Sequence, residues 1–245
     1  MQVLLFLHRL YFFVISNIRN KKTYKMKKII FLFIISSLIS IKGIGLTLSP
    51  ETEVSILTCA PGNELYSLFG HTAIRINDPR HQIDRVYNYG TFDFSTPHFY
   101  LKYARGLLPY QLTVQKFSHF IYNYQLEERT VYAQTIRLDS LEKQRIFDLL
   151  EENLLPQNRY YLYNFLFDNC TTRSRDILLK SLPDSVAWNM PDVNKNFWNL
   201  LDEYLQASPW VQWGIHTILG QRGNRTATTF QYMFLPDYLM YGLKN

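Results

Sequence analysis

The residue best suited to nucleophilic chemistry in this 245-residue chain is Cys170, in the sequence FDNCTTR. Asp168 and Asn169 are both good N-caps, so we predict a helix over 170–182 with the thiol in its first turn. The unpaired N–H groups and the helix dipole favour a thiolate at that position. Arg173, one turn later, adds positive charge on the same face. The pattern predicts an activated cysteine nucleophile; the alternative is a packed or disulfide-bonded cysteine.

His71 is the histidine best placed to act as the base for this thiol. It begins a predicted strand over 71–76, and a histidine at a strand end can reach a neighbouring helix terminus. The alternative is a histidine whose hydrogen bonds are satisfied within the core. The sequence contains no HExxH motif and no His, Cys or carboxylate cluster with metal-ligand spacing, so we expect no metal or cofactor.

A third group is expected to orient the imidazole, as the third member of a catalytic triad does. Asn88 lies on the predicted strand that pairs with the one bearing His71, and it is our first candidate. Its neighbours Tyr87 and Tyr89, together with Asp168, are the other candidates. Arg173, Tyr89 and Asp168 are also predicted to bind substrate.

The elements that would position these residues follow from apolar alternation, caps and turn residues. We expect strands over 54–59, 71–76, 85–89, 110–114 and 129–138. We expect helices over 97–106, 114–124, 140–155, 170–182, 194–206 and 208–219. The segment 160–167 fits either a buried strand or the approach to a helix. Strands clustered in the first half predict an α+β fold, with an antiparallel sheet packed against helices.

The charge distribution separates the N-terminus from the rest of the chain. Residues 1–45 carry eight Lys or Arg and no acidic residue, which leaves 18 of the 26 basic residues against all 20 acidic residues in 46–245. The near-neutral body lacks the electrostatic support that a nucleic-acid partner requires. Met26-Lys-Lys followed by the apolar run 29–41 predicts a signal peptide over 26–45. Residues 1–25 are then an upstream extension before a misassigned start.

The remainder, 46–245, is predicted to be a single exported domain. It contains no repeat, no low-complexity tract and no Gly/Ser linker. Its two cysteines, Cys59 and Cys170, could form one structural disulfide in an oxidising compartment.

The order of histidine first and cysteine last, with Asn-Cys opening a helix, resembles the circularly permuted branch of the NlpC/papain-like enzymes, which includes lecithin–retinol acyltransferase. A longer resemblance, to the Lnb N-terminal periplasmic domain of Bacteroidota, covers most of 50–240. It is carried by the segments SILTCAPG (55–62), LYSLFGHTAIR (65–75), YNYGTFDF (87–94), FDNCTTRSRD (167–176) and MFLPDYL (233–239).

This resemblance implies a permuted papain-like core and a lipoprotein N-acyltransferase that works in the periplasm at the membrane surface. Cys170 would take an acyl chain from a phospholipid or other lipid donor and His71 would serve as base. The acceptor would be the N-terminal amine of a lipoprotein. Members of the family continue into transmembrane helices, and nothing after residue 46 is long and apolar enough to span a bilayer. We therefore expect a domain without its membrane part.

Two other functions fit the same residues. One is a periplasmic cysteine hydrolase, a peptidase or amidase of the same fold, which needs an open and polar cleft. The other is a binding module without catalysis, in which Cys59 and Cys170 are joined in a disulfide.

Overall fold

The computed structural model describes residues 45–93, 95–99, 102, 106–182, 188, 190 and 194–244. The chain divides into two compact units, Met1–Leu46 and Thr47–Asn245, and every element below belongs to the second. The expected extension over 1–25 and the expected signal peptide over 26–45 lie, apart from Gly45, outside the described residues, as does much of the helix expected over 97–106. No helix in the described ranges is long and apolar enough to cross a bilayer.

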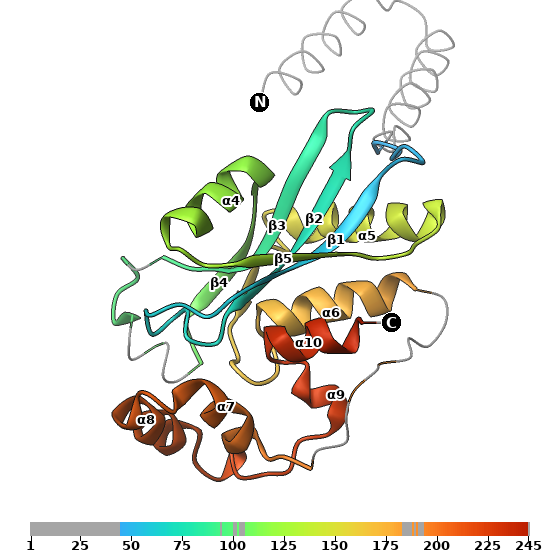
Figure 1. Cartoon of the computed structure of the whole chain (residues 1–245). Coiled ribbons are helices and arrows are strands. Elements are labelled where there is room, and N and C mark those ends of the chain that lie inside the picture. The colour runs from blue at the N-terminus through green and yellow to red at the C-terminus, as the bar shows by residue number, and fades with distance from the viewer. Residues whose placement is uncertain are drawn as a thin grey trace, which may run out of the picture. The chain divides into compact units, whose positions relative to one another are not determined.

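The second unit is built on a six-stranded sheet (Figure 1). All neighbouring strands pair antiparallel, in the order β5-β1-β2-β3-β4-β6. The strands are β1 (Glu53–Cys59), β2 (His71–Asp78), β3 (Ile83–Thr91), β4 (Pro109–Lys116), β5 (Val131–Thr135) and β6 (Tyr160–Leu162). The predicted α+β class and the antiparallel sheet are confirmed.

Helices cover both faces of this sheet. On one face, α5 (Ser140–Leu154) and α6 (Cys170–Ser181) pack against residues of β1, β2 and β3 such as Ile56 and Ile74. On the other face, Phe120 of α4 (Phe117–Leu126) packs against Leu57. Because β1 is apolar towards both faces, its residues after Glu53 are all buried, and burial of each large aliphatic side chain stabilises the fold by about 1.5–3 kcal/mol.

The last part of the chain forms short helices beside α6. They are α7 (Phe197–Leu205), α8 (Pro209–Leu219), the 3₁₀ turn η1 (Gly220–Arg222), α9 (Thr229–Tyr232) and α10 (Pro236–Gly242). A second core cluster joins α7 to the segment 232–238. In Figure 1, α10 lies alongside α6, while α7 and α8 lie together at one end of the unit.

Most element predictions are confirmed, and the differences have local causes. The α5 helix begins after Asp139, whose carboxylate accepts a hydrogen bond from the Glu142 N–H in a capping box. The strand expected over 110–114 continues to Lys116, because Val114 pairs with Tyr87 of β3, and the following helix therefore begins at Phe117. Only the first three residues of the ambiguous segment 160–167 form a strand.

A buried carboxylate anchors the chain just before β1. The Asp78 oxygens accept hydrogen bonds from the Ser49 N–H (2.8 Å), the Ser49 hydroxyl (2.7 Å) and the His81 imidazole (2.8 Å). Burial alone would raise the pKa of Asp78, but these hydrogen bonds outweigh it and hold the pKa well below its usual range. The ionised carboxylate is thus more stable in the folded than in the unfolded chain.

We expect Asp78→Asn to lower the free energy of unfolding by about 1–3 kcal/mol at pH 7, since it breaks a buried charge-assisted network. A depressed pKa gives stability that is present above the unfolded value of about 3.9 and is lost as pH falls below it, so the difference should shrink in acid. Urea denaturation at pH 7 and pH 3 measures both effects. Asp84→Asn is the control, because the Asp84–Arg75 pair is 42% exposed at the carboxylate and should matter by less than about 1 kcal/mol. Equal effects of the two substitutions would contradict the prediction.

Candidate active site

Cys170 is the first residue of α6, as the sequence predicts, and Asn169 is its N-cap. The Asn169 side-chain oxygen accepts hydrogen bonds from the N–H groups of Thr171 and Thr172, both at 2.9 Å. The N–H of Arg173 bonds the Asn169 carbonyl. Among the described residues, no partner occupies the N–H of Cys170, so this donor is open towards whatever binds at the thiol.

Asn169 also ties the start of α6 to two distant segments. Its side-chain NH₂ donates to the Phe165 carbonyl at 2.8 Å and to the Phe234 carbonyl at 2.9 Å. The residue is 3% exposed, so all four of its side-chain hydrogen bonds are shielded from water. The four hydrogen bonds of the Asn169 side-chain amide therefore fix the position of Cys170, the next residue in the chain.

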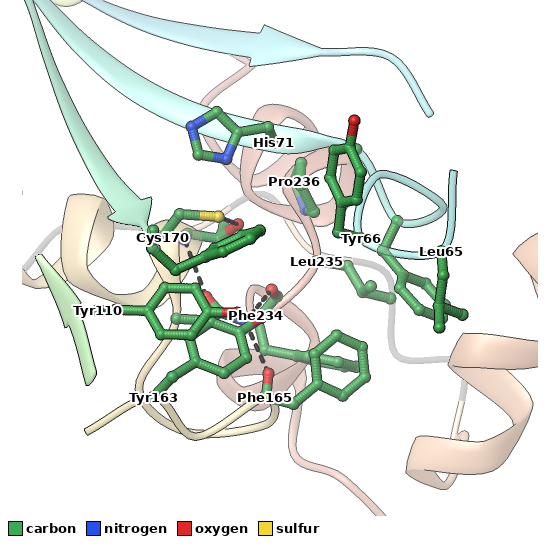
Figure 2. Close-up of a pocket in the computed structure, with 16 residues that line it drawn as sticks. Leu65, Tyr66, His71, Tyr110, Tyr163, Phe165, Cys170, Phe234, Leu235 and Pro236 are labelled. Carbon is green, nitrogen blue, oxygen red and sulfur yellow. Dashed lines mark hydrogen bonds between the residues drawn. The ribbon is translucent and has the colours of Figure 1, made fainter. Parts of the chain in front are cut away.

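His71 is the first residue of β2, and its imidazole lies between Asn88 and Cys170. The Nε2 atom is 2.7 Å from the Asn88 side-chain oxygen on β3. An amide oxygen only accepts, so Nε2 carries the hydrogen and Nδ1 is left to face the thiol. The imidazole also hydrogen-bonds Cys170, and Figure 2 shows the ring next to the sulfur at one end of a pocket. Of the four candidates for the orienting group, Asn88 is the one that contacts His71.

The electrostatics of the pair favour the charged forms. Burial raises the pKa of the Cys170 thiol, but the charge and hydrogen bond of His71 and a hydrogen bond from the Thr72 N–H outweigh it and lower the pKa to about 7. Burial lowers the pKa of His71, whereas Cys170 and Asn88 raise it, with a net rise. A thiolate beside an imidazolium is the arrangement that cysteine nucleophiles require.

Gly90 lies beside the two reactive side chains in a backbone conformation that favours glycine. The pairing of β3 with β4 shifts register between Asn88 and Thr91, and Gly90 in this irregularity has φ +99°. A Cβ atom there would lie 3.5 Å from Cys170 Cβ and 3.6 Å from His71 Cε1. The strand expected over 85–89 stops just before this glycine, which was not singled out as a site residue; its signal was an isolated glycine within a strand pattern.

We expect Gly90→Ala to destabilise the fold by about 1–3 kcal/mol, because the backbone conformation is strained for any residue with a Cβ. The added methyl also contacts both reactive side chains, so alkylation of Cys170 by iodoacetamide should slow by more than the stability change explains. Thermal unfolding and alkylation rates test this. Gly214→Ala is the control, since a Cβ at Gly214 meets no atom within 4 Å. Alkylation at the wild-type rate in Gly90→Ala would refute the prediction.

The pocket at Cys170 is lined mostly by aromatic and other apolar residues (Figure 2). Its cavity volume is about 70 Å³, several times the roughly 10–15 Å³ that one water needs. It is lined by Leu65, Tyr66, Phe69, Gly70, His71, Gly90, Phe92, Tyr110, Tyr163, Phe165, Asn169, Cys170, Thr171, Phe234, Leu235 and Pro236. Most of these residues could not be assigned to one pocket from the sequence, because they come from five separate stretches of the chain.

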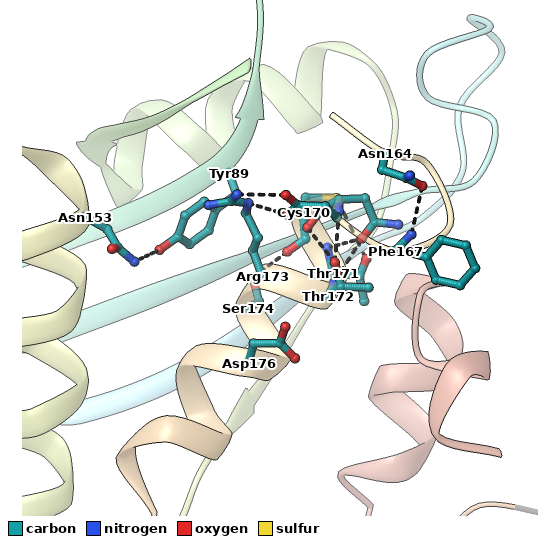
Figure 3. Close-up of polar contacts among 12 residues, drawn as sticks. Tyr89, Asn153, Asn164, Phe167, Cys170, Thr171, Thr172, Arg173, Ser174 and Asp176 are labelled. Atoms are coloured by element: carbon teal, nitrogen blue, oxygen red, sulfur yellow. Dashed lines mark hydrogen bonds and ion pairs between the residues drawn. The ribbon is translucent and has the colours of Figure 1, made fainter. Parts of the chain in front are cut away.

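The three residues predicted to bind substrate lie outside these walls. Arg173 bonds both Asp168 oxygens, at 2.6 and 2.9 Å, and its guanidinium stacks 3.5 Å from the centroid of the Tyr161 ring. Tyr89 is 1% exposed and its hydroxyl accepts a hydrogen bond from Asn153 (Figure 3). The Asp168 carboxylate thus pairs with the positive charge of Arg173, which we expected to act on the Cys170 thiol. Substrate binding by these residues stays a prediction.

Cys59 is a second free thiol on the other side of His71. It pairs with His71 across β1 and β2, is fully buried, and is not joined to Cys170. Burial, only partly offset by a hydrogen bond from Tyr124, raises the pKa of Cys59 to about 12. Cys59 is therefore a protonated, unreactive thiol at neutral pH, in contrast to Cys170.

No group of three or more His, Cys, Asp or Glu side chains that could hold a metal ion occurs in the described part of the chain. No curated protein and no solved structure matches the chain. The model of one protein family, the Lnb N-terminal periplasmic domain, matches residues 47–201, which include His71, Asn88 and Cys170. The match extends over more than half of the sequence and over both reactive side chains, and the chain therefore belongs to the family of Lnb N-terminal periplasmic domains.

Proposed function

We propose that this periplasmic domain is a thiol-dependent acyltransferase that moves an acyl chain from a lipid donor to the N-terminal amine of a lipoprotein. The observation that carries the proposal is the Cys170–His71–Asn88 arrangement at the end of an aromatic pocket. The order of the three residues and the nucleophile at a helix start also favour a permuted papain-like core.

In the first step, the Cys170 thiolate attacks the carbonyl carbon of the donor ester. The S–C bond forms, the ester C–O bond breaks, and the His71 imidazolium gives its proton to the departing alkoxide. The unoccupied N–H of Cys170 is placed to donate to the oxyanion that develops on the carbonyl oxygen. The product is a thioester on Cys170.

In the second step, the amine of the acceptor attacks this thioester. His71, now neutral, takes a proton from the amine, the amide C–N bond forms, and the C–S bond breaks to regenerate the thiolate. Asn88 keeps the imidazole in the tautomer and orientation that both steps need.

The residue types around the pocket are compatible with an acyl substrate. Ten of the 16 lining residues are aromatic or aliphatic side chains or proline, and the polar ones gather at the thiol. Burying apolar chain against such walls is favourable by roughly 25 cal/mol per Å². A hydrolase would use the same pair but would resolve the thioester with water, and the test below distinguishes the two.

The proposal is tested by trapping the thioester. The full chain is incubated with phospholipid carrying labelled acyl chains, and hydroxylamine-labile label on Cys170 is identified by mass spectrometry. A diacylglyceryl-cysteine peptide with a free amine is then added, next to the same peptide with a blocked amine. Cys59→Ser is the matched control, because it removes the other thiol of the chain and leaves Cys170 in place.

We expect label on Cys170 in the wild type and in Cys59→Ser, none in Cys170→Ser, and transfer only to the free amine. Release of free fatty acid that the amine peptide does not divert would make the protein a hydrolase. Failure of an alkylatable Cys170 to acquire label from any lipid would overturn the lipid-donor proposal.

A further inference from the structure

Helix α8 exposes an unusually apolar surface. None of its residues is buried, and Trp210 and Trp213 are 85% and 67% exposed, with Ile218 at 60%. Residues three and eight positions apart fall on one side of a helix, so these three side chains form one strip. Figure 1 shows α8 at the outside of the unit, next to α7. Large apolar side chains left together in water mark an interaction surface.

Other residues of α8 fix the helix to the protein. The His216 imidazole lies 2.8 Å from an Asp202 oxygen on α7 and stacks on the Trp198 ring at 4.8 Å. Val211 and Ile215 pack against the second core cluster. Because α8 packs against the rest of the protein, the exposed strip is held in a defined orientation.

The charges around the strip indicate what covers it. No Asp, Glu, Lys or Arg occurs within α8, and the segment that follows carries Arg222 and Arg225, both exposed. In the described part of the chain, neither arginine forms an ion pair with an acidic side chain. Arg225 lies 6.0 Å from the centroid of the Phe167 ring. Tryptophan is enriched where a bilayer meets water, and arginines without an acidic partner match anionic headgroups.

We infer that α8 and the arginines after it form a membrane-docking surface, with Trp210 and Trp213 inserted among the headgroups of an anionic bilayer. The family match ends at residue 201, so α8 lies outside the matched region. The docking does not depend on the proposed acyl transfer, since none of its residues contacts Cys170 or His71.

The inference also connects the membrane to the pocket. The cluster that supports α8 contains Phe69, Phe165 and Phe234, which line the pocket. At the pocket itself, Leu65 and Tyr66 are about half exposed, at 51% and 54%. A lipid held at α8 would thus lie over the same cluster that forms one wall of the site.

Quenching by brominated lipids tests the docking. All four tryptophans lie after residue 187, so their emission reports on the folded domain and not on the apolar N-terminal segment. The full chain with Cys170→Ser, which removes turnover, is mixed with vesicles of phosphatidylglycerol and phosphatidylethanolamine, with or without bromine near the top of the acyl chains. Trp210→Ala/Trp213→Ala is compared with Trp188→Phe, which removes a tryptophan that packs against the main core cluster instead.

We expect bromine to quench about half of the emission of the parent chain, because two of its four tryptophans are inserted, and almost none in the double variant. In Trp188→Phe the quenched share should rise to about two thirds, because two of the three remaining tryptophans are inserted. Arg222→Gln/Arg225→Gln should weaken binding to anionic vesicles about thirtyfold, at roughly 1 kcal/mol per arginine, with little change for neutral vesicles. Equal emission with and without bromine overturns the inference. A lipid-independent blue shift that grows with protein concentration would also overturn it, and would assign the strip to a second copy of the chain.

These outcomes are separate from those of the thioester trap. Quenching without acyl label would support the docking surface and overturn the proposed acyl transfer. Acyl label without quenching would support the acyl transfer and overturn the docking surface.

Discussion

Replacing His71 by alanine is expected to move the pH midpoint for alkylation of Cys170 from about 7 to above the ordinary thiol pKa of about 8.5. Burial of Cys170 raises its pKa, and the neighbouring imidazole is the main group that reverses this effect. Without it only the Thr72 N–H and the Thr171 hydroxyl stabilise the thiolate. Alkylation rates measured from pH 5 to 10 give the midpoint.

The same substitution should lower acyl transfer by about 10³-fold or more, because both proton transfers pass through His71. In the wild type, activity should fall as the pH drops below about 7, where the thiolate of Cys170 is protonated. His119→Ala is the control, since His119 is exposed on α4 and should leave the midpoint unchanged. A midpoint that stays near 7 in His71→Ala would exclude the proposed ion pair.

The second large effect is expected for Asn169→Asp, which should lower the free energy of unfolding by about 2–4 kcal/mol. Aspartate is itself a good N-cap, so the hydrogen bonds from Thr171 and Thr172 survive. The two donations to the carbonyls of Phe165 and Phe234 are lost, and a buried carboxylate oxygen then faces each carbonyl. The added negative charge should also raise the pKa of Cys170. Urea denaturation and the alkylation midpoint measure the two effects.

Asn196→Asp is a matched control for this experiment. Asn196 caps α7 in the same way, by accepting a hydrogen bond from the Asn199 N–H. Its NH₂ group donates to Asn224 in an exposed position, where water can replace the partner. We expect a change of less than about 1 kcal/mol there. If Asn169→Asp were as stable as the wild type, the amide donations would not be what fixes the start of α6.

The reactive pair could be predicted because its signals are local. Asn169 before Cys170 is a cap followed by a helical pattern, and His71 follows a glycine at the start of an alternating strand. Both signals depend on a few adjacent residues, so they can be recognised without knowledge of the fold. Asn88 followed from the same strand pairing, since β2 and β3 are joined by a short loop.

The surroundings of the pair could not be predicted, because they depend on contacts between distant segments. Phe234 and Pro236 reach the pocket from the end of the chain, and Tyr110 and Tyr163 reach it from other strands and loops. The partners of Arg173 could not be predicted for a related reason. Helical spacing places it on the face of Cys170, but its guanidinium is long enough to turn back to Asp168 and Tyr161.

The distance in sequence between the two reactive side chains determines when the Cys170 thiol becomes reactive. About a hundred residues separate His71 from Cys170, and the hydroxyls of Thr72 and Thr171 join the two segments by a 3.1 Å hydrogen bond only once strand and helix are packed together. An unfolded chain has an ordinary thiol with a pKa of about 8.5, which is mostly protonated at neutral pH. The Cys170 thiol of the newly made chain is therefore only weakly reactive, and it becomes a strong nucleophile when the tertiary structure is complete.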